Sequence, residues 1–177
     1  MNDIAMEQGY GVLTEPATVK IERLLPGPAE RIWSYLTDSE LRRKWLASGL
    51  MEAKLGSSVE LVWHNDDLTD PPGKRPPNFP ADHRMEVTIT ACEPNRKLAI
   101  SWGRSGGVTF ELEPRGKDVL LTVIHSRLPD RESLLNVSAG WHAHLDILVD
   151  VLTGAKSGPF WDDWAALKES YEARIPG

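Results

Sequence analysis

The stretch that decides the fold is GWHAHLDILVDVLTG, residues 140–154. Its apolar residues Trp141, Leu145 and Leu148 recur at spacings of three and four, which is the pattern of an amphipathic helix. Gly154 follows this run and is typical of the residue just past a helix C-terminus. The sequence therefore predicts one long helix near the C-terminal end, with an apolar face that must pack against another layer.

Upstream of this helix, between residues 50 and 126, the hydrophobic period changes to two. Short alternating runs such as Val59, Leu61 and Trp63 are separated by turn residues, which favours an antiparallel meander of five or six strands. The other predicted inward faces are Met85, Val87, Ile89 and Ala91; Leu98, Ile100 and Trp102; Val108, Phe110 and Leu112; and Val119, Leu121 and Val123. Gly106-Gly107 is one of the predicted turns.

The segment before the meander predicts a strand followed by two short helices. Residues 17–25, ATVKIERLL, alternate like a strand, and Pro28 suits the first turn of a helix. Asp38 or Ser39 can cap a second short helix, with Trp45 on its apolar face.

Two segments lie outside this order. Residues 64–80, HNDDLTDPPGKRPPNFP, are too polar and too rich in proline for a strand and predict a long loop. Beyond the long helix, residues 160–175 align Trp161 and Trp164 with further apolar residues and predict a second amphipathic helix.

Composition narrows the class of protein. The chain has 177 residues, 41% of them hydrophobic, and a net charge of −6, which fits one domain and argues against a nucleic-acid partner. The single Cys92 cannot form an internal disulfide, and residues 1–10 do not resemble a signal peptide, so we expect a cytoplasmic protein. Asp146 and Asp150 interrupt the most apolar helical stretch, which excludes a membrane span there.

Four segments carry a resemblance to a known family. They are ERLLPGPAERIWSYLTDSELRRKWLA at 22–47, CEPNRKLAISW at 92–102, LLTVIHSRLP at 120–129 and GWHAHLDILVDVLTG at 140–154. Together they resemble the START-like (SRPBCC) superfamily, in particular single-domain proteins of the activator of heat shock protein 90 ATPase type.

The resemblance implies an α+β helix-grip fold. A curved antiparallel sheet of about six or seven strands would wrap around a long C-terminal helix, with two short helices after the first strand. An N-terminal extension would span residues 1–16, and the START-like domain residues 17–177, including a helical tail at 159–175.

The resemblance leaves several functions open, because such proteins include co-chaperone domains linked to the stress response, polyketide cyclases and lipid carriers. We expect a small hydrophobic or aromatic ligand to bind in an apolar cavity between the sheet and the long helix, with the loop at 64–80 as a movable cover. One alternative is a cyclase-like or hydrolase-like enzyme with His125, His144 or His83 as general base. Another is a co-chaperone or protein-interaction module, or a homodimer, that docks through residues 160–175 or through the convex face of the sheet.

The predicted ligand contacts are the inward-facing residues near the long helix. They are Trp63, Met85, Val87, Trp102, Phe110, His125, Trp141, His144, Leu145 and Leu148. Among them His125 continues an inward strand face, so it is either a polar anchor for the ligand or a buried histidine bonded to a neighbouring backbone group. Trp33 and Trp45 are expected to be packing residues.

No metal, cofactor or catalytic residue is assigned from the sequence. His142 and His144 are two residues apart on one helix, so their side chains point about 200° apart and cannot chelate one metal from that helix. Cys92 has no adjacent cation that would lower the pKa of its thiol, which favours a structural role.

Overall fold

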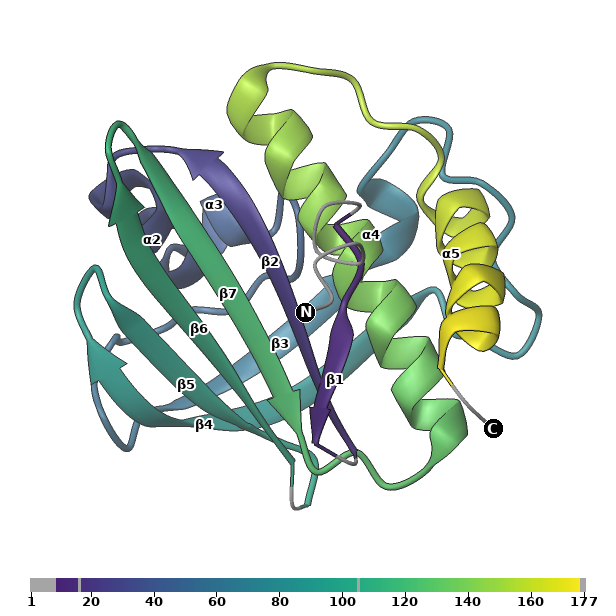
Figure 1. Cartoon of the computed structure of the whole chain (residues 1–177), viewed down its shortest axis with the longest axis horizontal. Helices are drawn as coiled ribbons and strands as arrows, with labels where there is room; N and C mark the ends of the chain where they lie inside the picture. The colour runs from purple at the N-terminus through teal and green to yellow at the C-terminus, as the bar shows by residue number, and fades with distance from the viewer. Residues whose placement is uncertain (1–8, 16, 105, 176–177) are drawn as a thin grey trace.

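Helix α4 (Arg131–Thr153) lies across one antiparallel sheet in the computed structural model of the chain, which describes residues 9–15, 17–104 and 106–175 (Figure 1). The sheet has seven strands in the order β1-β2-β7-β6-β5-β4-β3. The strands are β1 (Val12–Glu15), β2 (Thr18–Pro26), β3 (Ser58–His64), β4 (Asp82–Glu93), β5 (Lys97–Trp102), β6 (Gly106–Arg115) and β7 (Asp118–Ser126). The predicted α+β helix-grip fold is confirmed.

Alternation along the strands places the core between the sheet and α4. Val59, Leu61 and Trp63 of β3 are all buried, as is every predicted inward residue of β6 and β7. Met85 and Trp102 are only half-buried, because they lie toward the end of the sheet where α4 does not fill the space alone.

The two short helices are α2 (Ala29–Thr37) and α3 (Ser39–Arg42). Asp38 caps α3 as predicted, accepting hydrogen bonds from the amides of the next turn. Trp45, however, lies beyond the end of α3. At the end of this helix the buried guanidinium of Arg42 donates to the backbone carbonyls of Leu36 and Ala47 at 3.1 Å each.

Two further features were not predicted. Strand β1 pairs with β2 at the sheet edge, inside the predicted N-terminal extension. Gly106 and Gly107 begin β6 and do not form the turn themselves. A side chain at Gly106 would place its Cβ 2.8 Å from the carbonyl oxygen of Trp102, so the close approach of two strands requires glycine there.

Helix α5 (Phe160–Arg174) packs along α4, and the 3-10 turn η1 (Asn65–Asp67) opens the long connection from β3 to β4 (Figure 1). This connection approaches the N-terminal end of α5. The backbone amide of Trp161 donates to the carbonyl of Pro72 at 2.9 Å, and the amide of Phe160 donates to Thr69 Oγ1 at 2.9 Å. The predicted loop and the predicted second helix are therefore one packed unit.

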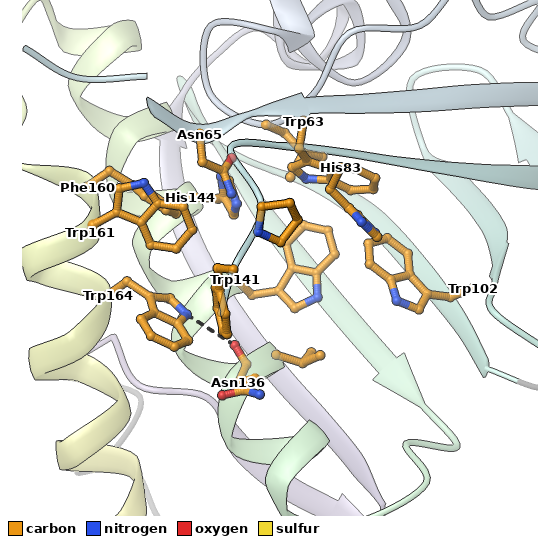
Figure 2. Close-up of a pocket in the computed structure, with 15 residues that line it drawn as sticks. Trp63, Asn65, His83, Trp102, Asn136, Trp141, His144, Phe160, Trp161 and Trp164 are labelled. Carbon is orange, nitrogen blue, oxygen red and sulfur yellow. Dashed lines mark hydrogen bonds between the residues drawn. The ribbon is translucent and has the colours of Figure 1, made fainter. Parts of the chain in front are cut away.

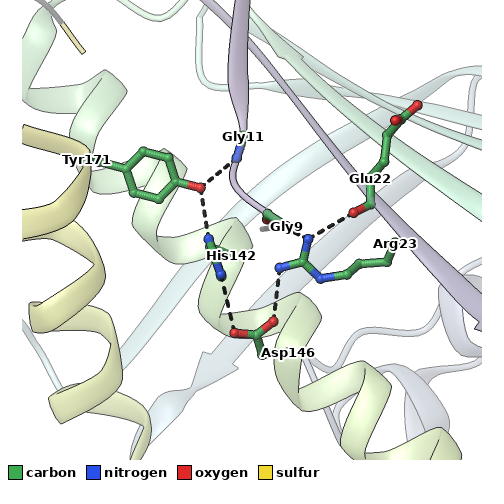
Figure 3. A network of polar contacts seen from close by, with 7 residues as sticks. All are labelled: Gly9, Gly11, Glu22, Arg23, His142, Asp146 and Tyr171. Atoms are coloured by element: carbon green, nitrogen blue, oxygen red, sulfur yellow. Dashed lines mark hydrogen bonds and ion pairs between the residues drawn. The ribbon is translucent and has the colours of Figure 1, made fainter. Parts of the chain in front are cut away.

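A buried polar network fastens the other side of α4 (Figure 3). The hydroxyl of Tyr171 accepts from the amide of Gly11 at 2.7 Å and lies 2.9 Å from Nδ1 of His142. His142 Nε2 lies 3.5 Å from Asp146, which also accepts from Arg23 at 2.9 Å. Burial, helped by nearby Arg23, lowers the pKa of His142 to about 3, so the ring is a neutral link between β1, α4 and α5.

Candidate functional site

A cavity of about 350 Å³ opens between α4, the N-terminal end of α5 and the β3–β4 connection (Figure 2). The ends of β3, β4 and β5 close it on the sheet side. Its lining residues are Leu46, Trp63, Asn65, Phe79, Pro80, His83, Trp102, Asn136, Val137, Gly140, Trp141, His144, Phe160, Trp161 and Trp164. This volume lies within the range of cavities that hold small molecules.

Aromatic rings form most of the wall. Seven of the lining residues are Trp or Phe, and five of the seven tryptophans of the chain are among them. On the sheet side, the ring of Trp102 lies 5.6 Å from that of Trp63 and 5.9 Å from that of Trp141, at inclined angles. Such edge-to-face packing orders the rings without filling the cavity.

The cover over the cavity comes from α5 and the β3–β4 connection. The indole of Trp161 donates to Asp66 Oδ1 at 2.7 Å, which ties the helix to η1. The ring of Phe79 lies 5.8 Å from that of Trp161 and 5.1 Å from that of Trp164. The connection is therefore a cover that is fastened to α5, and its movement stays a prediction.

His144 is a buried histidine in an otherwise apolar part of the lining. Its Nδ1 lies 2.8 Å from the carbonyl oxygen of Trp45, and the ring packs 4.9 Å from that of Phe160. Burial lowers the pKa of His144 to about 4, so the imidazole is neutral at pH 7. Because a carbonyl oxygen only accepts, Nδ1 carries the proton and Nε2 keeps a free lone pair.

Two amide side chains line the same cavity. The Oδ1 atoms of Asn65 and Asn136 are buried, and neither accepts a hydrogen bond from the residues that the structure describes. Both atoms lie beneath the surface of the cavity wall, so a ligand could contact either one only after a side-chain rotation.

Four of the predicted ligand contacts line the cavity: Trp63, Trp102, Trp141 and His144. The other six pack behind the lining: Met85, Val87, Phe110, His125, Leu145 and Leu148. Whether any of the ten contacts a ligand stays a prediction. Trp33 and Trp45 lie outside the lining, where packing accounts for them.

His125 is fully buried behind the aromatic wall. Its Nδ1 accepts from the indole of Trp141 at 3.0 Å, and the ring lies 5.0 Å from that of Trp102. Burial lowers its pKa to about 4. The expected backbone partner is replaced by an indole on α4, so His125 orients a cavity tryptophan from behind.

The residues that sequence reasoning missed come mainly from the cover and from the polar side of α4. They are Leu46, Asn65, Phe79, Pro80, Asn136, Val137, Gly140, Phe160, Trp161 and Trp164. The aromatic stripe at residues 160–164 was a usable signal. The stripe predicts a surface that caps the sheet or forms a dimer contact, and the structure places Phe160, Trp161 and Trp164 in the cavity wall, while dimerisation stays a prediction.

Within the described ranges, no group of three or more His, Cys, Asp or Glu side chains could hold a metal ion. No described helix is long and apolar enough to cross a membrane.

The curved sheet, the long helix across it and the cavity between them define a START-like domain of helix-grip fold. The chain belongs to the family described as activator of Hsp90 ATPase homolog 1-like protein, which matches residues 26–153. This family and fold are those of ligand-binding or cyclase-like domains.

Several solved structures are similar to this chain. The solution NMR structure of a Bordetella parapertussis protein is similar, with a TM-score of 0.79 and 36% identity over 96% of this chain and 92% of that one. CalU16 from Micromonospora echinospora has a TM-score of 0.66 and 23% identity, over 91% of this chain and 92% of its own. A conserved Enterococcus faecalis protein of unknown function has a TM-score of 0.66 and 18% identity, over 97% of this chain and 92% of its own. The last two show the fold alone. The comparison with curated proteins gives no match.

Proposed function

We propose that this protein binds a small hydrophobic or aromatic ligand in the cavity between the sheet, α4 and α5, as a carrier or sensor. The observation that carries the proposal is the aromatic wall: seven Trp and Phe side chains surround about 350 Å³. No Asp, Glu, Lys or Arg is among the described lining residues. Apolar cavities with a few placed polar groups are the usual design of small-molecule sites.

Burial of two of the three candidate histidines favours binding over catalysis, whereas the third, His83, is exposed where it lines the cavity. A general base must take up a proton near the working pH. Burial lowers the pKa of both His144 and His125 to about 4, so each is a weak base at pH 7. These two histidines therefore support retention of a ligand better than proton transfer. A cytoplasmic location remains a prediction from the sequence.

The test is a titration of the full chain with Nile red, a neutral hydrophobic dye. We expect saturable one-to-one binding with a rise in dye fluorescence and quenching of tryptophan emission. Trp102→Leu removes an aromatic face worth about 1 kcal/mol to a bound ring, which corresponds to about fivefold weaker binding.

Trp33→Leu is the matched control, since Trp33 is also half-buried but lies outside the cavity. Dye affinity should stay within about twofold in this variant, because no cavity surface changes. Absence of saturable binding, or equal losses in the two folded variants, would falsify the assignment.

A further inference from the structure

His144 gives the cavity wall a hydrogen-bond acceptor. The contact of His144 Nδ1 with the carbonyl oxygen of Trp45 at 2.8 Å fixes the tautomer, because the carbonyl cannot donate. A neutral imidazole has one N–H, so Nε2 of His144 only accepts. A ligand that hydrogen-bonds to Nε2 of His144 must therefore supply the donor.

The two asparagine oxygens add no acceptor to the open cavity. Oδ1 of Asn65 and Oδ1 of Asn136 are buried with no donor among the described residues. A ligand donor could reach either oxygen only after the side chain rotated toward the cavity. The exposed His83 at the rim does not require a donor on the ligand.

The same wall disfavours a charged ligand. A carboxylate would have to leave water with no Lys or Arg among the described lining residues to pair with it. An ammonium group would find no carboxylate in the lining either. The nearest acid in the cover, Asp66, already accepts from Trp161 at 2.7 Å and pairs with Arg75 at 3.4 Å.

Resting on the proposed function, we infer that the cavity selects an uncharged aromatic ligand with hydrogen-bond-donating substituents, such as a phenol or an aryl N–H. Nε2 of His144 accepts one of these hydrogen bonds. The flat rings of Trp102 and Trp141 supply the stacking surface (Figure 2).

A matched ligand series on the full chain tests this directly. Naphthalene, 1-methoxynaphthalene, 1-naphthol, 1-naphthoate and 1-naphthylmethylammonium share one ring system and differ in donor and charge. One added hydrogen bond predicts that 1-naphthol binds about threefold to tenfold more tightly than 1-methoxynaphthalene. Both charged compounds should bind at least about tenfold more weakly than 1-naphthol.

Each outcome of this series decides a different question. Equal affinity for 1-naphthol and 1-methoxynaphthalene would overturn the donor requirement, and tight binding of either ion would overturn the requirement for an uncharged ligand. In both cases the proposed function would stand. Failure of every compound to bind would instead refute the proposed function.

His144→Phe keeps a ring in the wall and removes the acceptor. The preference for 1-naphthol over 1-methoxynaphthalene should fall to about one, with 1-methoxynaphthalene binding within about threefold of the parent. His64→Phe is the matched control, because His64 is exposed and pairs with Asp82 outside the cavity, and it should keep the preference. A preference that survives in folded His144→Phe would overturn the assignment to Nε2. If that variant does not fold, the ligand series on the parent chain still tests whether the ligand must supply a donor.

Discussion

Gly140 offers a substitution that should stabilise the protein and block its cavity together. It lies in the interior of α4 and lines the cavity. A Cβ at this position would meet no heavy atom of the described residues within 4 Å beyond its own helix neighbours. A methyl group added there therefore meets no clash, and we expect a longer side chain to extend into the cavity.

The expected stability change follows from helix propensity. Glycine in a helix interior is about 1 kcal/mol less favourable than alanine, so Gly140→Ala should raise the free energy of unfolding by about that amount. Gly140→Leu adds apolar surface against the aromatic wall, worth about 0.8 kcal/mol for each buried methylene group. We expect a gain of about 1–3 kcal/mol for the leucine variant.

The binding change has the opposite sign. Leucine would occupy part of the cavity, so Nile red affinity should fall at least about tenfold, whereas alanine should change it little. Urea denaturation gives the free energy of unfolding and dye titration gives the affinity. Ala166→Leu, on the exposed face of α5, is the control for added apolar volume outside the cavity. Destabilisation by Gly140→Leu, or unchanged dye affinity, would refute the reasoning.

Three other predictions follow from the packing around α4. Tyr171→Phe removes a hydroxyl bonded at two points, so the free energy of unfolding should drop by about 1–3 kcal/mol in urea denaturation, and an unchanged midpoint would contradict the role of the network. The pKa of His142 is about 3 when folded and about 6.5 when unfolded, so the unfolded state binds more protons below pH 6.5. Stability should therefore fall by about 1.4 kcal/mol per pH unit for this histidine between pH 6 and 4, and a melting temperature independent of pH over that range would count against a neutral buried ring. Removal of residues 158–177 takes away α5 and its share of the cavity wall, so the melting temperature and Nile red binding should both fall, and retention of either would contradict the assigned cover.

Hydrophobic period predicted the sheet and α4 well, because a strand face or helix face is fixed by spacing alone. Val59, Leu61 and Trp63 alternate in the sequence and are buried together in the structure. The inward position of His125 followed from the same alternation. Its partner could not be predicted, because the indole of Trp141 comes from α4, where the crossing of helix and sheet sets the contact.

The sequence predicts residues 64–80 as a cover, but it does not predict the course of this segment or its contacts. Residues 64–80 have no period, and single side chains fix their course, as in the bond from Trp161 to Asp66. Asn65 and Asn136 looked like ordinary polar positions, because neither carries a pattern that separates a cavity wall from a surface. Helical spacing likewise could not predict the contacts of Arg42 with two backbone carbonyls at the end of α3.

The contact between Gly11 and Tyr171 joins positions 160 residues apart. On the ribosome, β1 and every other strand of the sheet emerge well before α5, since synthesis proceeds from the N-terminus. Phe160, Trp161 and Trp164 therefore reach the aromatic wall only after the sheet and α4 have been made. The aromatic wall is therefore completed only when α5 has docked against α4, so the N-terminal and C-terminal parts of the described chain must both be in place before the cavity is enclosed.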